Sequence, residues 1–208
     1  MEELIEEIEE LKKSPIKEII EKRTKEFEEL GKKDSNEIFK ELCFCLLTAN
    51  FSAAGGIKIQ SNIGEGFFNL PEQDLAKKLS ELGHRFPNAR AKFIAEARKY
   101  RSSIKEILNR FEYETDARNW LAKNVKGLGM KEASHFLRNI GYKNVAIIDF
   151  HILDLLEKYK LIEKPKTLSP KKYVEIENLL RQIAKKTTTN LGELDLYLWY
   201  KETGKVLK

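Results

Sequence analysis

The sequence has 208 residues, of which 41% are hydrophobic and 34% are charged, a composition typical of globular proteins rather than disordered or membrane-spanning chains. No apolar run approaches the length of a transmembrane helix, and the acidic start Met1-Glu2-Glu3 argues against a secretory signal. We therefore expect a cytoplasmic protein with a sizeable core and no membrane partner.

The net charge of +5 is unevenly spread along the chain. Residues 1–50 contain nine Lys and Arg against fourteen Asp and Glu, a net charge of −5, so the remaining residues carry +10. A basic remainder suits a face that meets a polyanion. A plain solvated Lys/Glu surface explains the same numbers, and charge alone does not choose between these interpretations.

Nearly every segment has the apolar spacing of an amphipathic helix. Leu4, Ile5, Ile8 and Leu11 form the first stripe, and a second stripe runs from Ile16 to Leu30. The predicted helix starts are Ser14-Pro15, Asp34-Ser35, Ser52, Pro71, Pro87, Thr115-Asp116 and Ser169-Pro170, and the predicted ends are Gly31, Gly64, Gly83 and Gly141. These signals predict roughly ten to twelve short helices. With no long linker between them, we expect one compact all-α unit over residues 1–208.

The two cysteines, Cys43 and Cys45, lie in the apolar run 42–47. A metal site needs further ligands at suitable spacing, and none lies nearby in the sequence. We therefore expect buried free thiols, and the lack of a four-cysteine cluster argues against an iron–sulfur centre. His135 and His151 also lack a clear set of partner ligands, so we expect structural histidines and no metal.

The segment Val125–Ser134 predicts two helices joined by a tight hairpin. Gly127 and Gly129 would let the backbone turn with positive φ and approach another molecule closely. The free amides at the start of the second helix would then form an anion site suited to a DNA phosphate. Lys131 lies in the first turn of that helix. An amine placed there, where the helix dipole disfavours a cation, is suited to attack an electrophilic sugar carbon and to form a Schiff base.

Asp149 follows Val145–Ile148, an apolar run too short to seed a sheet and expected to be a buried connector. The simplest role of Asp149 is an N-cap of the next helix. Capping and catalysis are compatible, because a carboxylate held by its own helix can also orient an amine and stabilise charge developing on a sugar. A DNA-binding hairpin without chemistry is the alternative, and Lys131 with Asp149 at this spacing favours the catalytic interpretation.

The region from Gly127 to Asp149 resembles the helix–hairpin–helix glycosylase superfamily. Over nearly its whole length the chain is similar to the compact type 2 8-oxoguanine DNA glycosylase/lyases of archaea and some bacteria. The residues that carry this closer match are ELCFCLLTAN at 41–50, GHRF at 83–86, KEASHFLRN at 131–139, LDLYLWY at 194–200 and TGKVLK at 203–208. The resemblance implies a two-lobed fold. The N- and C-terminal helices would form one lobe, and the middle helices, about 50–140 with the hairpin at 124–131, would form the other.

The resemblance also implies the chemistry and the partner. Lys131 would displace the damaged base and hold the sugar as a Schiff base, Asp149 would assist, and β-elimination would nick the strand 3′ to the abasic site. The partner would be double-stranded DNA containing 8-oxoguanine, bound by a monomer. No organic cofactor is expected, although hairpin carbonyls could hold a structural monovalent cation. A glycosylase for oxidised pyrimidines is the nearest alternative enzyme, and the missing iron–sulfur motif and the terminal block argue against it.

For base recognition the resemblance implies Phe86 and Trp199 as aromatic faces around the base, although spacing alone would make Trp199 a core residue. The terminal carboxylate or backbone of Lys208 is expected to meet the N7–H that distinguishes 8-oxoguanine from guanine. The expected DNA contacts come from Asn50, His84, Arg85, Gly127 and Gly129, with Arg85 equally suited to a phosphate or to the pocket. The position after Asp149 is often basic in these relatives, whereas this chain has Phe150.

Overall fold

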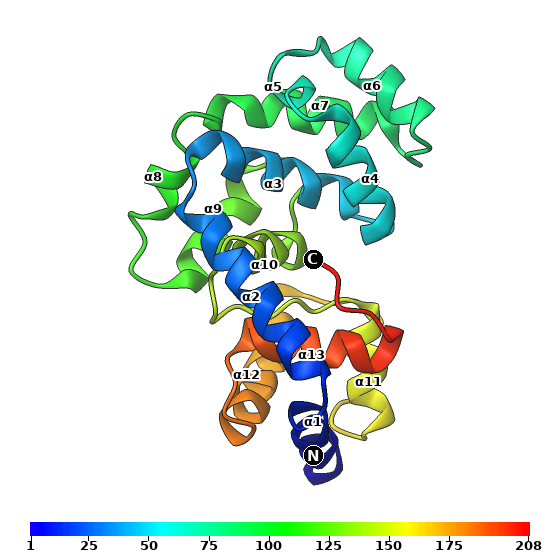
Figure 1. Ribbon diagram of the computed structural model, residues 1–208, viewed down its shortest axis with the longest axis vertical. Helices are drawn as coiled ribbons and strands as arrows, with labels where there is room; N and C mark the ends of the chain where they lie inside the picture. Colours follow the sequence, from blue (N-terminus) through cyan, green and yellow to red (C-terminus); the bar gives the residue numbers. More distant parts are fainter.

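The computed structural model describes residues 1–208, and its regular structure is entirely helical (Figure 1). The helices are α1 (Glu2–Lys12), α2 (Ile16–Lys32), α3 (Ser35–Thr48), α4 (Ala53–Ile63), α5 (Gly66–Asn69), α6 (Glu72–Glu81), α7 (Pro87–Ala97), a 3₁₀ helix (Arg98–Tyr100), α8 (Ile104–Leu108), α9 (Glu114–Asn124), α10 (Met130–Asn139), α11 (Phe150–Lys158), α12 (Pro170–Lys186) and α13 (Leu191–Thr203). The all-α prediction is confirmed, with slightly more helices than expected. None of them has both the length and the apolar character needed to cross a membrane.

Several predicted helix starts are confirmed by the residues that cap them. Asp34, Ser52 and Ser169 each accept a hydrogen bond from a backbone amide in the first turn of α3, α4 and α12, respectively. Pro87 is the first residue of α7, where its missing amide hydrogen is not needed. The helix borders therefore follow local side-chain chemistry at most positions.

Two predicted borders are slightly displaced. Gly31 does not end a helix, because α2 continues to Lys32. A Cβ atom on Gly31 would lie 2.1 Å from the carbonyl oxygen of Ile140, so the glycine is needed where α2 packs directly against the end of α10. The start predicted at Thr115-Asp116 is displaced, since α9 begins at Glu114 after Tyr113, which provides no side-chain cap.

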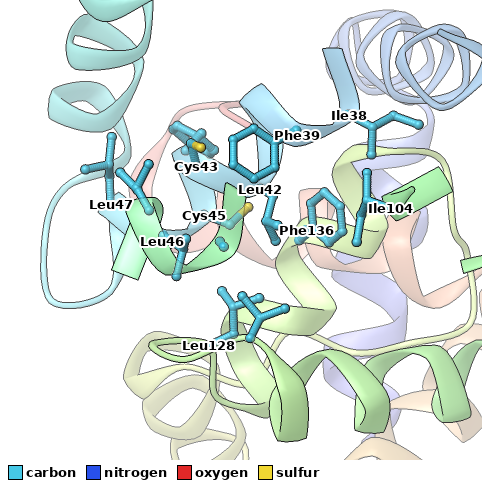
Figure 2. Close-up of a cluster of buried hydrophobic side chains, with 14 of the residues drawn as sticks. Ile38, Phe39, Leu42, Cys43, Cys45, Leu46, Leu47, Ile104, Leu128 and Phe136 are labelled. Carbon is cyan, nitrogen blue, oxygen red and sulfur yellow. The ribbon is translucent and has the colours of Figure 1, made fainter. Parts of the chain in front are cut away.

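The buried side chains form two hydrophobic clusters, one for each lobe. The cluster of the middle lobe extends from Ile38 to Val145 and includes the apolar face of α3, shown with its neighbours in Figure 2. The other cluster joins α1 and α2 to α11, α12 and α13. The middle lobe therefore begins in α3, earlier than the predicted border near residue 50, because α3 packs mainly against α4, α7, α8 and α10.

Cys43 and Cys45 lie in the core of the middle lobe as free thiols with no exposed surface, as predicted. Burial raises the pKa of both thiols well above the ordinary value, because a thiolate would lose its hydration there. Their role in this structure is apolar packing.

The segment Val145–Ile148 is a buried, irregular connector between the lobes, as the sequence predicted. Its backbone groups bond to side chains instead of to another strand. The Ala146 amide donates to a Glu177 carboxylate oxygen at 2.8 Å, and the Tyr173 hydroxyl donates to the Ala146 carbonyl at 2.7 Å. Glu177 also forms a buried ion pair with Arg118 of α9, which ties α12 to the middle lobe.

Candidate active site

A cleft of about 730 Å³ lies between the two lobes. The middle lobe contributes the end of α3, the start of α4 and one face of α10, and the other lobe contributes the start of α11, α13 and the residues after it. Of the expected site residues, Lys131, Asp149, Trp199, Lys208 and Asn50 line the cleft. Phe86, His84, Arg85, Gly127 and Gly129 are not among its lining residues.

The predicted hairpin is confirmed between α9 and α10, and it places Lys131 in the first turn of α10. Gly127 has a φ of +94°, and a Cβ atom there would lie 2.4 Å from the ring of Phe93, so only glycine fits. Gly129 differs from the prediction, because its φ of −90° is open to any residue. Its amide donates to the Glu132 carboxylate at 3.3 Å, which caps the start of α10.

Lys131 and Asp149 reach the cleft from opposite lobes. The Lys131 side chain is 25% exposed, and its ammonium lies 4.0 Å from the Glu132 carboxylate. Asp149 is the N-cap of α11, and one of its carboxylate oxygens accepts the Ile152 amide at 3.0 Å. Because that bond uses one oxygen only, the second oxygen is available to a ligand in the cleft. The predicted cap is therefore confirmed, and it fixes the carboxylate at the site.

Two charged residues that sequence reasoning missed, Arg138 and Asp195, also line the cleft. Their nearest charged atoms are 3.3 Å apart. Burial raises the pKa of Asp195 to about 6, with Arg138 opposing the shift and Asp149 adding to it. Burial also lowers the pKa of Arg138. An aspartate in the otherwise apolar run Leu194–Leu198 was a usable signal, since such residues are rarely buried without a partner.

Aromatic rings form a connected group at the side of the cleft that faces α11 and α13. The His151 ring meets the Trp199 ring edge-on, with the centroids 5.0 Å apart. Phe150 lies 3.9 Å from His151 and is 62% exposed, the highest exposure among the phenylalanines. Trp199 is therefore a residue of the cleft rather than of the core, and Phe150 presents an apolar surface at the cleft.

Phe86 and Trp199 do not form a sandwich in this structure. Phe86 is 38% exposed and lies outside the cleft, whereas Phe51 is the aromatic residue that the middle lobe contributes to the lining. Phe51 stacks on His84 with the ring centroids 4.3 Å apart. A grip on the base by Phe86 stays a prediction, and it requires Phe86 to approach the cleft when DNA binds.

The DNA contact expected of His84 stays a prediction, and in the free protein its side chain is buried. His84 is only 4% exposed, because its ring lies beneath Phe51. Nε2 lies 3.0 Å from the Leu47 carbonyl, and Nδ1 accepts the Phe86 amide at 3.0 Å, so both nitrogens already have partners. Burial lowers the pKa of His84, which keeps the ring neutral. Arg85, in contrast, is exposed and free to meet a phosphate.

Asn50 and His135 border the cleft in different ways. Asn50 is exposed at the end of α3 and has a φ of +58°, a conformation that asparagine tolerates better than most residues. His135 was expected to be structural, yet it lines the cleft, and neither ring nitrogen makes a well-aligned hydrogen bond. Burial lowers its pKa well below the ordinary value, and the adjacent Lys208 carbonyl only partly offsets this shift. The ring is therefore neutral, and both of its nitrogen atoms are buried in the free protein.

No three His, Cys, Asp or Glu side chains lie close enough together to hold a metal ion. The monovalent cation expected at the hairpin stays a prediction.

The fold and the site together define a class of protein. The chain superposes on endonuclease III in a non-covalent complex with DNA at a TM-score of 0.58 and 17% identity, covering 89% of this chain and 83% of the other. At that identity the likeness concerns the fold alone. An all-helical, two-lobed fold with a helix–hairpin–helix that carries a lysine into the cleft is the helix–hairpin–helix DNA glycosylase fold.

Within that class, residues 20–189 match the family model described as 8-oxoguanine DNA glycosylase, and the chain belongs to this family. It is 58% identical to the 8-oxoguanine DNA glycosylase/AP lyase of Korarchaeum cryptofilum, over 100% of this chain and 99% of the relative. It superposes with a TM-score of 0.96 on the Methanocaldococcus jannaschii 8-oxoguanine glycosylase/lyase in complex with a 15mer DNA containing 8-oxoguanine. That protein is 57% identical, with 99% of both chains covered.

Proposed function

We propose that this protein removes 8-oxoguanine from DNA and then cleaves the strand at the abasic site. The observation that carries the proposal is the meeting of Lys131 and Asp149 in one cleft, at the end of a DNA-binding hairpin, in a chain of the 8-oxoguanine DNA glycosylase family. The target nucleotide has to leave the duplex stack, because no enzyme group reaches its glycosidic bond inside the helix. The cleft between the lobes receives it.

The reaction begins with the neutral amine of Lys131. Its lone pair attacks C1′ of the deoxyribose, and the C1′–N9 bond breaks with its electron pair leaving on the base, which takes up a proton. The Asp149 carboxylate stabilises the positive charge that develops on the sugar. Opening of the sugar ring gives a Schiff base between Nζ and C1′. Loss of a C2′ proton then expels the 3′ phosphate, which nicks the strand, and water releases Lys131.

Recognition of the base uses both stacking and buried polar groups. Trp199 provides an aromatic face, a contact worth about 1–3 kcal/mol for a stacked base. His135 and Arg138 border the same cleft with buried nitrogen atoms that make no well-aligned hydrogen bond in the free protein, and we propose that a polar base edge reaches them when DNA binds. The backbone of Lys208 is the proposed acceptor for N7–H of 8-oxoguanine. Unmodified guanine lacks that donor and would leave the acceptor unpaired.

The protein side that faces DNA is proposed to include the exposed side chains of Asn50 and Arg85 and the start of α10 after the hairpin. Phe150 would contact the DNA through an apolar ring rather than through a charge. We propose that the protein acts as a monomer in the cytoplasm, at the nucleoid.

The test compares end-labelled duplexes that contain 8-oxoguanine, thymine glycol or plain guanine, each incubated with and without borohydride. We expect a trapped protein–DNA adduct and a nicked strand with 8-oxoguanine only. In Lys131→Gln we expect no adduct and at least about a thousandfold slower excision, because the nucleophile is absent. Circular dichroism of this variant confirms that it folds.

The other outcomes identify the alternatives. Trapping with thymine glycol instead would keep the Lys131 chemistry and make the protein a glycosylase for oxidised pyrimidines. DNA binding without an adduct or released base would make it a non-catalytic hairpin module. An adduct that persists in Lys131→Gln would disprove the assignment of the nucleophile.

A further inference from the structure

The residues after α13 cross from one lobe to the other. Gly204, with a φ of +68°, ends α13 and turns the chain back toward the cleft. Val206 packs against the cluster of the lobe that contains α13, while Lys205, Leu207 and Lys208 line the cleft. In Figure 1 this tail runs from α13 at the lower lobe to a point beside α3 and α10. Residues 204–208 therefore form a strap over the cleft.

The strap ends in a polar socket of the middle lobe. The Lys208 ammonium donates to a Glu41 carboxylate oxygen at 2.8 Å and to the Gln60 side-chain oxygen at 2.5 Å, and it lies 4.3 Å from the centre of the Phe44 ring. The Lys208 side chain is 19% exposed and that of Glu41 only 2%. This contact is far better shielded from water than a surface ion pair, and it is correspondingly stronger.

Glu41 is held in turn by two other side chains. Asn139 of α10 donates to its other carboxylate oxygen at 2.6 Å, and Gln60 of α4 donates to the oxygen that Lys208 contacts, at 3.2 Å. Side chains from α4 and α10 thus hold this carboxylate of α3. Its only cationic hydrogen-bond partner is Lys208. A buried carboxylate without that partner is strongly unfavourable, so the conformation in which Lys208 occupies the socket is favoured.

We infer that Glu41 is a positioning residue that acts through Lys208. By holding the Lys208 ammonium, Glu41 fixes the backbone of the same residue beside His135, where the damaged base is read. The inference rests on the proposed function for the role of the Lys208 backbone. The seating of the strap itself is a property of the free protein and does not depend on that function.

The first measurement needs no DNA. The protein, with no residue added after Lys208, is treated with carboxypeptidase B, which releases a C-terminal lysine or arginine. We expect Glu41→Gln to release Lys208 at least about tenfold faster than the unaltered protein, since the loss of a charge-assisted hydrogen bond exposes the tail. Glu37→Gln is the matched control, one turn earlier on α3 and paired with Lys40 at the surface, and it should leave the rate unchanged.

The second measurement is single-turnover excision of 8-oxoguanine by Glu41→Gln, Lys208→Met and the double variant. Each single change is expected to slow excision about tenfold or more with little change in duplex affinity. The double variant should be no slower than the slower single variant, because both changes release the same strap. Lys208→Arg, which keeps the charge, should recover most of the rate and the protection from carboxypeptidase B. It also carries the test if Glu41→Gln does not fold.

A double variant that loses the product of the two single losses would overturn the inference, because Glu41 would then act independently of Lys208. Unchanged release of Lys208 in Glu41→Gln would overturn it as well. Normal trapping with 8-oxoguanine and an unaffected rate in Glu41→Gln would reject the positioning role and keep the proposed function. Faster tail release in a protein that never traps 8-oxoguanine DNA would keep the seating and reject the function.

Discussion

At the scale of single residues, capping chemistry and catalytic chemistry coincide at Asp149. One carboxylate oxygen holds the first turn of α11, and the same residue lines the cleft. Lys131 is likewise placed by local structure, because it lies in the first turn of α10 after the hairpin. Arg138 and Asp195 add a second pair of opposite charges between α10 and α13.

Substitutions of Phe86 and Phe51, two aromatic residues of the middle lobe, are expected to have different effects on activity and stability. Phe86→Ala should slow excision of 8-oxoguanine by about tenfold if its ring stacks on the flipped base. It should lower Tm less than Phe51→Ala does, because Phe86 is 38% exposed in the free protein. Phe51→Ala should lower Tm, since it removes the stack on His84. A normal rate in Phe86→Ala with a slowed rate in Phe51→Ala would assign the second aromatic face to Phe51.

DNA affinity should depend on pH through Asp195, whose pKa is about 6. Above that pH the carboxylate is charged and repels phosphate, and below it the carboxyl group is neutral. We therefore expect Kd for a duplex, measured by fluorescence anisotropy at low salt, to fall about threefold between pH 7.5 and pH 5, the effect of removing one partly screened charge. Asp195→Asn should remove this dependence. If the variant keeps the inflection near pH 6, another group is responsible.

At the scale of elements, polar contacts join the two lobes on the side of α9 and α12. Local sequence patterns do not predict these contacts. The connector 145–148 lacks a strand partner, so side chains from α12 satisfy its backbone. Arg118 and Glu177, 1% and 2% exposed, come from different lobes and neutralise each other. The strap with Lys208 crosses from the other direction, over the cleft.

Glu177→Gln is expected to destabilise the protein by about 3–5 kcal/mol, because it leaves the Arg118 charge buried without its partner. Thermal unfolding followed by circular dichroism measures this change. Glu175→Gln is the control, since Glu175 pairs with Lys172 at the surface, and its effect should stay within about 0.5 kcal/mol. Equal stability of both variants would show that the buried ion pair does not join the lobes.

At the scale of the whole molecule, the structure shows where the unevenly distributed charges of the sequence lie. The acidic N-terminal segment begins in α1, which lies at one end of the molecule (Figure 1) and contributes no residue to the cleft lining. The cleft is lined by four basic side chains (Lys131, Arg138, Lys205 and Lys208) and three acidic ones (Glu132, Asp149 and Asp195), a balance of +1, whereas α1 has six glutamates and one lysine, a balance of −5. Since basic groups attract the phosphate backbone, this distribution favours DNA that approaches the cleft over DNA that approaches α1.

The sequence by itself determined the features whose physics is local. Apolar spacing predicted the helices, Asp34, Ser52 and Ser169 predicted their starts, and the glycines predicted the hairpin that carries Lys131. Resemblance over the whole chain predicted the family and the two lobes. The predictions of helices, helix starts and the hairpin succeed because capping, helix periodicity and tight turns depend on residues only a few positions apart.

The tertiary structure alone decided which side chains share the cleft. Arg138 and Asp195, or Glu41 and Lys208, are too far apart in sequence for any spacing rule to join them. Burial also depends on the packed neighbours, so only the folded structure shows that His84 is buried and that His135 lines the cleft. Gly31 is a glycine because α2 meets Ile140, a contact that exists only after the chain has folded.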